Sequence, residues 1–481
     1  MKRRVLVAGL ASAAALGGGL EAARARPQGP RLDGPADVLV VGSGLAGLSA
    51  AVSAREAGAS RVVVLEKDYL LGGHSAIANG YFAAVRLGGR SRAEYEQAVR
   101  QMIADMNQTG RGAGDQRLIE TLVRGTGPAL QWLSRHGVVW MDSTYEALGG
   151  LAPRSYVSSF ERGGYDFVRA LSRAARRLGV EIRFSSRATA IARSGPNLVV
   201  TVNGRAPVAA RSVVLATGGF GDNPRMRMKY DPRLTEDIRS TANPYGEEHD
   251  TAMGDGIALG ESLGAALVDM DQILTIPYSG GRLTNYVGAD IYLTREGRRF
   301  VREDAPMDAI SEAVWKLPTH DFWVVTDSQS AKGASRNVKL IKGLVKTADS
   351  LEEAARGMGI DPARFKAVMA RYNESAKSGR DPEFGRTMFT QQIIRPPFYY
   401  GLEKPYVHFC NGGLRFSPEG KVLRADLSAV EGLFAAGEVT GGVHGQGRLG
   451  GCSLPDCAVF GHIAGRSAAA RARRLKAGRR T

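Results

Sequence analysis

Cysteine is scarce in this sequence. Three cysteines occur among the 481 residues, Cys410, Cys452 and Cys457, and none belongs to a C-x-x-C or C-x-x-C-H motif. An odd number of cysteines without those spacings argues against a disulfide framework, a zinc site and covalently attached haem. We therefore expect Cys452 and Cys457 to be packing residues, and we expect no metal site.

Acidic residues are the minority among the charged side chains. The chain has 48 Asp and Glu residues against 64 Lys and Arg residues, which gives a formal net charge of +16. A basic protein could bind nucleic acid, but here the basic residues are scattered and no aromatic residues are interleaved with them. The excess therefore indicates an Arg-rich surface with a solvated basic tail at residues 471–481, and no nucleic-acid partner.

Long apolar runs are missing as well. The one candidate, Val5–Leu20, is diluted by Gly and Ala and is a poor transmembrane helix. Because Lys2-Arg3-Arg4 precedes it and Ala23-Arg24-Ala25 follows it, residues 1–25 are typical of an export signal cleaved after about Ala25. The adjacent arginines indicate the twin-arginine route, which carries folded proteins. The sequence thus predicts a periplasmic protein with no integral membrane segment in the mature chain.

A β-turn-α-β unit follows this segment. Asp37–Val41 is expected to be a buried strand, residues 42–47 (GSGLAG) a tight turn, Leu48–Ala57 a helix, and Arg61–Leu65 a second strand ending at Glu66. Glycines in such a turn let the backbone approach a pyrophosphate, and the helix N-terminus favours its negative charge. The acid at the end of the second strand can accept ribose hydroxyls. The unit therefore predicts a dinucleotide site.

Glycine-rich turns of the same kind recur later in the chain. A buried strand at Val213–Ala216 runs into the sequence TGGF, and residues 252–256 (AMGDG) open a helix expected to reach Gly264. Near the C-terminus, residues 432–451 form a long glycine-rich run before a helix expected from about Ser453 to Ala470. Nucleotide-type turns thus occur at both ends of the chain.

The composition changes between these turns, over Tyr278–Pro396. Strand-like segments at Ile291–Thr294 and Phe322–Thr326 alternate there with amphipathic helices at Ser350–Gly357 and Asp361–Ser375. This pattern is typical of a separate domain inserted into the nucleotide-binding fold.

We therefore predict an α/β protein. A Rossmann-like, two-dinucleotide-type domain is expected at residues 36–277 and 397–470, and an inserted α+β capping domain at 278–396. Clefts between such units are where substrates usually lie.

The motifs together resemble a known family. The run GEVTGGVHGQGRLGG, with ATGGFG, GDG and GSGLAG…LEK, is similar to the flavoprotein subunits of fumarate reductases and succinate dehydrogenases. The resemblance is nearest to the soluble, periplasmic flavocytochrome-type fumarate and urocanate reductases. It implies bound FAD, a mobile capping domain over the flavin, and hydride transfer between flavin N5 and a carbon–carbon bond.

The resemblance and the motifs also imply a set of FAD contacts. Ala188 matches the position whose backbone usually meets the adenine, and Asp255 is placed to hold a ribityl hydroxyl. The whole expected set is Gly42, Ser43, Gly44, Ala46, Gly47, Glu66, Lys67, His74, Ser75, Asn79, Gly80, Ala188, Thr217, Gly218, Asp255, Glu438, Ser453 and Leu454.

Two residues match the family's substrate-binding positions and are our expected catalytic residues. His408, in the sequence HFCNGG, matches the histidine that binds a carboxylate or carbonyl oxygen of the substrate. Arg448 matches the arginine that clamps a substrate carboxylate bidentately, a task that suits a planar, permanently charged guanidinium. The alternatives are a core histidine near a turn and an arginine in a surface salt bridge.

The sequence departs from the fumarate reductases at two positions. Ile276 stands before Pro277, where those enzymes have a histidine, and the place of their general-acid arginine falls on Met307, after the sequence GRRFVRE at 297–303. Because a thioether cannot donate a proton, we do not expect fumarate reduction as that family performs it. The cap-domain candidates for handling the proton are Tyr278, Tyr286, Arg302 and Asp304.

The position of His74 also favours substrate oxidation over reduction. The sequence GHSAIANG at 73–80 aligns with the membrane enzymes' motif whose histidine is covalently bonded to the flavin, a bond that favours substrate oxidation. The alternative is that His74 only hydrogen-bonds the flavin.

The function we expect is FAD-dependent hydride transfer at a carbon–carbon bond adjacent to a carboxylate or carbonyl, as a dehydrogenase more than a fumarate reductase. The expected partners are a small carboxylate or enone substrate and an unidentified electron acceptor or donor. The alternatives are a ketosteroid-type dehydrogenase and a flavin electron-transfer protein without substrate chemistry of its own.

Overall fold

The computed structural model describes residues 34–147, 149–160, 162–243, 251–277, 283–284, 287–305, 307–330 and 336–478. The expected export signal at residues 1–25 lies outside them, so export to the periplasm stays a prediction. No helix within the described ranges combines the length and the apolar character needed to cross a membrane.

The larger sheet is built around β1 (Ala36–Val41), all of whose residues are buried. β1 pairs in parallel with β2 (Val62–Leu65) on one side and with β8 (Ala206–Leu215) on the other. A nearly continuous apolar sequence suits this position, because helices and neighbouring strands cover both faces of such a strand. The other strands of the sheet are β5 (Glu181–Arg183), β6 (Ala188–Ser194), β7 (Asn197–Val202), β17 (Lys421–Leu423) and β18 (Ala429–Ala435).

Five neighbouring strands of this sheet run in the same direction, in the order β18-β8-β1-β2-β5. Their carboxyl ends therefore meet at one edge. β1 is the strand from which the chain continues first to one side and later to the other, which is the point where α/β sheets bind their ligands.

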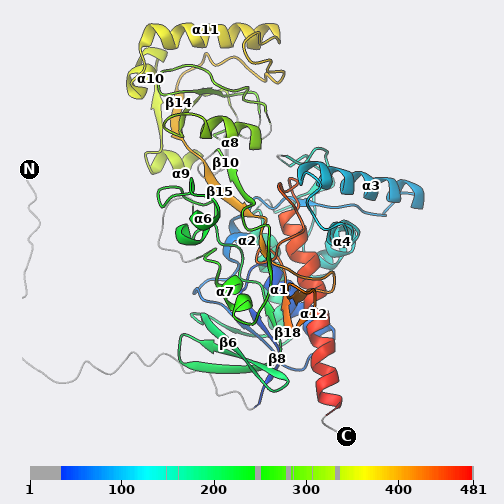
Figure 1. The fold of residues 1–481 in the computed structure, drawn as a ribbon. Coiled ribbons are helices and arrows are strands. Elements are labelled where there is room, and N and C mark those ends of the chain that lie inside the picture. Colours follow the sequence, from blue (N-terminus) through cyan, green and yellow to red (C-terminus); the bar gives the residue numbers. More distant parts are fainter. Residues whose placement is uncertain are drawn as a thin grey trace, which may run out of the picture. The chain divides into compact units, whose positions relative to one another are not determined.

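Two helices rich in small residues pack beside this sheet. α1 (Leu45–Glu56) follows the first glycine turn, and α12 (Ser453–Ala477) lies alongside it (Figure 1). A Cβ added at Gly461 would lie 2.5 Å from Ala46 O, and one added at Gly465 would lie 2.1 Å from Ala50 O. The glycines of α12 thus let the two backbones approach closely.

α12 is longer than the sequence suggested, because it continues through Ala477 and not only to Ala470. Arg471, placed in a solvated tail by the sequence, is buried, and its guanidinium binds the carboxylate of Glu431 and the carbonyl of Arg211. The expectation of a solvated tail was therefore wrong for Arg471 and Ala472, which are buried, whereas Arg473 and Arg474 are exposed as expected. Partners far away in the sequence hold this turn of α12.

The remaining short elements lie around these layers. They are α2 (Gly73–Ile77), β3 (Phe82–Ala83), α3 (Arg92–Thr109), α4 (Gln116–Arg135), β4 (Ser155–Tyr156), α5 (Tyr165–Arg177), α6 (Pro224–Tyr230), α7 (Asp255–Glu261), β9 (Leu267–Val268), β10 (Ile273–Ile276), β15 (Tyr406–Cys410) and β16 (Gly413–Leu414). β10 and β15 pair antiparallel.

A second, antiparallel sheet has the order β11-β12-β14-β13. Its strands are β11 (Ile291–Leu293), β12 (Phe322–Thr326), β13 (Val345–Ala348) and β14 (Phe398–Glu403). Alternate residues face opposite sides. Ile291 and Leu293 pack with α10 (Leu351–Met358) and α11 (Pro362–Ser378), whereas Tyr292 packs with α8 (Met307–Trp315). A further short helix is α9 (Arg336–Ile341).

β14 belongs to this second sheet, so the sheet extends to Glu403, past the limit expected at Pro396. Residues 35–481 pack as one compact unit, and the division into 36–277, 278–396 and 397–470 stays a prediction. The mixed α/β architecture itself confirms the predicted fold class.

Candidate active site

The carboxyl edge of the parallel strands gathers residues that the sequence singled out. The turn at 42–47 follows β1, Glu66 follows β2, Thr217 and Gly218 follow β8, and Glu438 comes shortly after β18. Because these strands are parallel neighbours, four segments that are distant in the sequence meet at this edge.

The three glycines of the first turn have different roles. Gly42 has φ +102°, and a Cβ there would lie 2.3 Å from Ala216 O; a Cβ at Gly47 would lie 2.0 Å from Gly42 O. The fold itself therefore requires both. At Gly44 the nearest atom to an added Cβ is Ser75 Oγ, at 3.4 Å, an ordinary contact. The space beside Gly44 is thus free of close protein atoms within the described residues.

This space lies at the N-terminus of α1. Gly44 is the N-cap, no acidic residue occupies the first helical turn, and Ser75 Oγ accepts a hydrogen bond from Leu45 N at 3.1 Å. Such a terminus, uncapped by any carboxylate within the described chain, attracts an anionic group. A pyrophosphate fits it.

Glu66 ties the glycine turn to the end of β2. Its carboxylate accepts hydrogen bonds from Ser43 N at 3.0 Å, from Ser43 Oγ at 2.5 Å and from Asp68 N at 2.9 Å. A carboxylate has about four acceptor sites, so room remains for a ribose hydroxyl beside these contacts.

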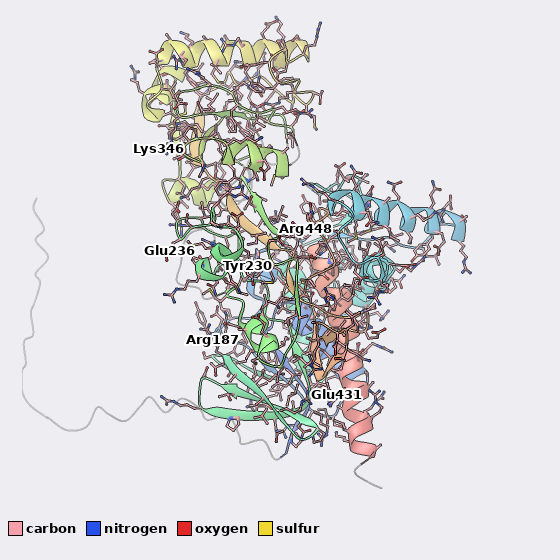
Figure 2. All side chains as sticks on the ribbon, viewed as in Figure 1. Arg187, Tyr230, Glu236, Lys346, Glu431 and Arg448 are labelled. Carbon is pink, nitrogen blue, oxygen red and sulfur yellow. The ribbon has the colours of Figure 1, made fainter. Side chains whose placement is uncertain are left out.

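Asp255, the first residue of α7, sits between two cations. It accepts from Lys67 Nζ at 2.9 Å and from Arg187 Nη2 at 2.8 Å. Burial alone would raise the pKa of Asp255, but Lys67 and Arg187 lower it below its usual value. Arg187 lies beside α7 in Figure 2, and the sequence analysis missed it, although it noted the adjacent Ala188.

The other expected cofactor residues lie on short elements around the same edge. Ser75 is in α2, Asn79 is exposed, and Gly80 has φ +82° with its Cβ position 2.6 Å from Gly163. The remaining ones are helix or strand residues: Ala46 in α1, Ala188 at the start of β6, and Ser453 and Leu454 at the start of α12.

His408 and Arg448 also come together. Arg448 Nη2 lies 3.1 Å from His408 Nε2, and the guanidinium carbon stands 5.0 Å from the centre of the Phe409 ring. Figure 2 labels Arg448 near the beginning of α12. β15 presents His408, and the loop before α12 presents Arg448.

Thr241 joins His408 to a second histidine. Its Oγ1 lies 3.0 Å from His408 Nδ1 and 3.3 Å from His74 Nε2. The backbone places it there, because Ser240 bridges to Val407 and Thr241 N donates to Val407 O. The sequence analysis missed Thr241, because no local motif signals a pairing between segments so far apart.

Glu438 completes this group of side chains. Its Oε1 accepts from Cys410 N at 3.0 Å, and its Oε2 lies 3.9 Å from His74 Nδ1. Burial raises the pKa of Glu438 to about 7, against the opposing effects of the Cys410 amide and of Arg448. Burial also lowers the pKa of both histidines, that of His408 the more strongly, with Arg448 adding to the effect.

The two departures from the fumarate reductase pattern have structural explanations. Ile276 ends β10 as a buried residue opposite Tyr406. Met307 opens α8 and packs against the apolar cluster that contains Phe322 and Val324. Both positions are filled by apolar packing, so neither offers a group that exchanges a proton.

The motif GRRFVRE contributes structure to the second sheet's domain. Arg299 donates to both oxygens of the buried Glu303, at 3.0 and 2.8 Å, and to both oxygens of Asp381. Arg386 Nη1 donates to Glu303 at 3.0 Å. Arg299 and Glu303 thus serve a buried ion-pair network, in which removal of one partner is costly.

Two of the four cap residues expected to handle the proton, Arg302 and Asp304, lie among the described residues. Asp304 accepts from Arg302 Nε, from Thr387 N and Oγ1 and from Met388 N. Burial would raise the pKa of Asp304, but these hydrogen bonds lower it overall. Asp304 is therefore held ionised by Arg302 and by the loop at 387–388. Neither Asp304 nor Arg302 is suited to exchange a proton with a substrate. Tyr278 and Tyr286 lie outside the described residues.

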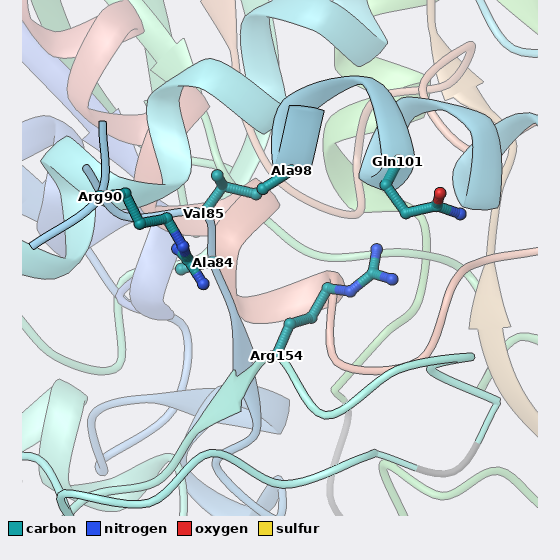
Figure 3. A pocket seen from close by; sticks show the side chains of 6 residues that line it. All are labelled: Ala84, Val85, Arg90, Ala98, Gln101 and Arg154. Atoms are coloured by element: carbon teal, nitrogen blue, oxygen red, sulfur yellow. The ribbon is translucent and has the colours of Figure 1, made fainter. Parts of the chain in front are cut away.

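A separate hollow is lined by Ala84, Val85, Arg90, Ala98, Gln101 and Arg154 (Figure 3). None of the expected site residues lines it.

The three cysteines are free thiols, Cys410 and Cys452 buried and Cys457 half-buried. Within the described ranges, no group of three or more His, Cys, Asp or Glu side chains could hold a metal ion.

Comparison with known proteins decides the family. Residues 37–454 match the family model described as "FAD binding domain". A probable fumarate reductase of Shewanella frigidimarina is 32% identical over 90% of this chain and 74% of its own length. The urocanate reductase of Eggerthella lenta is 33% identical over 93% of this chain and 77% of its own length.

The chain belongs to the FAD-binding family of fumarate reductase flavoproteins. It is an FAD-dependent oxidoreductase. A solved structure agrees: the open conformation of a flavocytochrome c3 fumarate reductase superposes with a TM-score of 0.75 at 30% identity, over 91% of this chain and 79% of that one. The resemblance noted in the sequence is thereby confirmed, and so is FAD as the cofactor.

The site residues fit this cofactor. The open face at Gly44 suits the pyrophosphate, Glu66 retains acceptor capacity for a ribose, and the glycine turns at Gly218 and Gly437 have φ +77° and +76°. Which of these side chains contacts FAD remains a prediction for each residue.

Gly44 offers the sharpest test of the pyrophosphate site. We expect Gly44→Ala to fold normally, because the nearest atom to its Cβ is Ser75 Oγ at 3.4 Å. Its affinity for FAD should fall at least about tenfold, because the added methyl group collides with the pyrophosphate. Titration of the apoprotein with FAD, monitored by flavin fluorescence, measures this. Gly88→Ala is the matched control, since its nearest atom is an arginine nitrogen at 3.8 Å. Unchanged FAD affinity in Gly44→Ala would place the pyrophosphate elsewhere.

Proposed function

We propose that this protein moves a hydride between its flavin and a carbon–carbon bond next to a carboxylate, and that oxidation of the saturated acid is the favoured direction. The observation that carries the proposal is the state of the Arg448 guanidinium. Nη1 donates to Leu449 O at 3.2 Å and Nη2 contacts His408. Nε is buried without a hydrogen-bond partner among the described residues.

A guanidinium in this state needs a counter-charge. Burial lowers the pKa of Arg448, which means that its charged form is poorly solvated where it lies. No carboxylate among the described residues forms a salt bridge with it. A substrate carboxylate that accepts from Nε and Nη2 would supply both the missing hydrogen bond and the charge, in the bidentate geometry that arginine favours.

His408 stands where the second part of the substrate would lie. Its Nε2 accepts from Arg448 in the free protein, so this atom becomes available once a substrate engages the guanidinium. The bound flavin supplies hydride acceptance or donation at N5. The chain's own residues bind and orient the substrate, since Arg448 fixes the carboxylate and His408 lies beside it.

The direction rests on Met307 and Ile276. Reduction of a double bond needs a proton donor as well as a hydride. Both of these positions hold apolar side chains, the buried Ile276 and the half-buried Met307. Oxidation needs a base, and a neutral imidazole with a free lone pair is one. This supports a dehydrogenase that passes its electrons to an acceptor still to be identified.

The state of Arg448 also weighs against the other candidates. A ketosteroid-type dehydrogenase acts on a substrate without a carboxylate, which would leave the guanidinium without a counter-charge. A flavin carrier without substrate chemistry would have no use for a half-buried arginine beside a histidine, with its Nε buried and without a partner among the described residues. We therefore place both behind the acid dehydrogenase.

The His74 imidazole favours a non-covalent flavin. Its Nε2 contacts the Thr241 hydroxyl, and its Nδ1 faces Glu438 at 3.9 Å, beyond hydrogen-bond distance. A covalent bond at Nε2 would abolish the contact with Thr241. The hydrogen-bonding alternative for His74 is therefore the one we adopt, with the covalent bond decided by the test below.

Arg448→Lys tests the substrate clamp. We expect turnover to fall by at least on the order of 10²-fold, because an ammonium cannot hold a carboxylate bidentately. FAD content should stay at one per chain, as measured by absorbance after protein denaturation. Arg395→Lys, an exposed change in the second sheet's domain, is the control. Equal turnover in Arg448→Lys and the wild type would show that Arg448 does not orient the substrate.

Acid denaturation tests the attachment of the flavin. We expect all FAD to be released into the supernatant and no fluorescent band to remain on a denaturing gel, because Nε2 of His74 is engaged by Thr241. His74→Asn should then leave the amount of released FAD unchanged. A fluorescent band at the mass of the chain that disappears in His74→Asn would establish the covalent bond instead.

A further inference from the structure

Five side chains from distant segments form a continuous row. Arg448 contacts His408, Thr241 links His408 to His74, and His74 faces Glu438. The segments are the loop before α12, β15, the loop after residue 240, α2, and the turn after β18. Apart from Arg448, each member can both give and accept a proton.

The donors and acceptors of this row have a fixed order. Arginine can only donate, so His408 Nε2 must be the acceptor and His408 Nδ1 carries the proton. Nδ1–H then donates to Thr241 Oγ1, which leaves the hydroxyl proton for His74 Nε2 at 3.3 Å or for the more distant carbonyl of His408 at 3.4 Å. With Nε2 accepting, a neutral His74 carries its proton on Nδ1, towards Glu438.

We propose that this row carries the proton of the reaction, with His408 Nε2 as the atom that exchanges it with the substrate and Thr241 as the positioning residue that connects the two histidines. The inference rests on the proposed function. It assigns the proton chemistry to the FAD-binding part of the chain and not to the cap candidates.

The step balances for oxidation of a saturated acid. The hydride leaves one carbon with its electron pair for the flavin, and the neighbouring carbon gives a proton to His408 Nε2 as the double bond forms. His408 Nδ1–H passes its proton to Thr241, Thr241 passes its own to His74 Nε2, and His74 Nδ1–H passes its proton to the Glu438 carboxylate. Each member gains one proton and loses one, except Glu438, which ends protonated; reduction runs through the same atoms in reverse.

The charges around the row suit this role. Asp222 and Arg448 act on His74, while Arg448 and His74 act on His408. The lowered pKa values of both imidazoles keep them neutral, so they transmit a proton without storing it.

The carboxyl at the end of the row is placed to store the proton. Glu438 is influenced by Arg448, Asp222, Asp456 and the amide of Cys410, and its pKa of about 7 lets it release the proton near neutral pH. For oxidation its charged form is the acceptor, so kcat should rise with pH through about 7. The 3.9 Å between His74 Nδ1 and Glu438 Oε2 needs a small approach of the two side chains.

Thr241→Val and Thr241→Ser in the FAD-loaded full chain test the row. Valine keeps the shape and removes the hydroxyl, whereas serine restores it. The substrates are succinate, propanoate and 3-(imidazol-4-yl)propanoate, followed by anaerobic loss of flavin absorbance. Ring-nitrogen NMR of the ¹⁵N-histidine-labelled protein, assigned with His408→Gln and His74→Asn, reports the tautomers without any substrate. Thr319→Val, an exposed change, is the matched control.

We expect the wild type and Thr241→Ser to show His74 protonated on Nδ1 alone, because its Nε2 accepts from the hydroxyl at position 241. In Thr241→Val that preference should be lost, while His408 keeps its proton on Nδ1 because Arg448 still donates to its Nε2. In the same variant kcat should fall by about 10²-fold with KM within about threefold, and the rise of kcat near pH 7 should disappear. A Thr241→Val enzyme with wild-type kcat, pH profile and histidine spectra would overturn the proposal. If no acid bleaches the wild-type flavin, the proposed function is wrong. The histidine spectra alone then decide whether the hydrogen-bonded row exists.

Discussion

The parallel pairing of β1 with β2 and β8 is the constraint on which the site depends. It brings the glycine turn after β1, Glu66 and Thr217 to one edge, although β8 is separated from β1 by most of the first half of the chain. Registers such as Val40 opposite both Val64 and Val214 fix the relative heights of these strand ends. A one-residue shift would turn their side chains to the opposite face.

A second pairing brings together the residues that we propose to bind the substrate. The bridge between Ser240 and Val407 places Thr241 against His408, and the antiparallel pair of β10 and β15 supports the same strand. The hydrogen-bond row therefore depends on backbone contacts between segments that are remote in sequence. Arg448 sets its direction, since a donor-only side chain makes His408 Nε2 the acceptor.

Met307, Ile276 and Asp304 offer no group for proton exchange, and this is why the row of side chains matters to the account. Met307 and Ile276 are satisfied by packing, and Asp304 is committed to Arg302 and to the loop at 387–388. In our proposal the proton is handled from the FAD-binding side, where two imidazoles with lowered pKa values and a carboxyl with a raised pKa lie next to one another. In this proposal substrate binding and proton exchange share His408.

Local patterns were sufficient to predict much of this arrangement. Short-range periodicity and glycine spacing define the strand at Asp37–Val41, the turn at 42–47 and Glu66. The strand predicted at Phe322–Thr326 has the same first and last residues in the structure. Thr241 and Arg187 were missed because their roles come from tertiary pairing. The end of α12 was misjudged for the same reason: Arg471 is buried and binds Glu431, a tertiary contact that the basic local sequence does not indicate.

The identity of the substrate class is the central claim, and anaerobic titration of the flavin tests it most directly. The FAD-loaded protein is mixed, without oxygen, with saturated acids and with ketosteroids, and the reduced protein with the matching enoic acids and enones. We predict that at least one saturated acid bleaches the oxidised flavin, faster than its enoic partner restores the colour of the reduced one, and that the ketosteroids have no effect. Bleaching by ketosteroids alone, or a flavin that no acid reduces or reoxidises, would contradict the account.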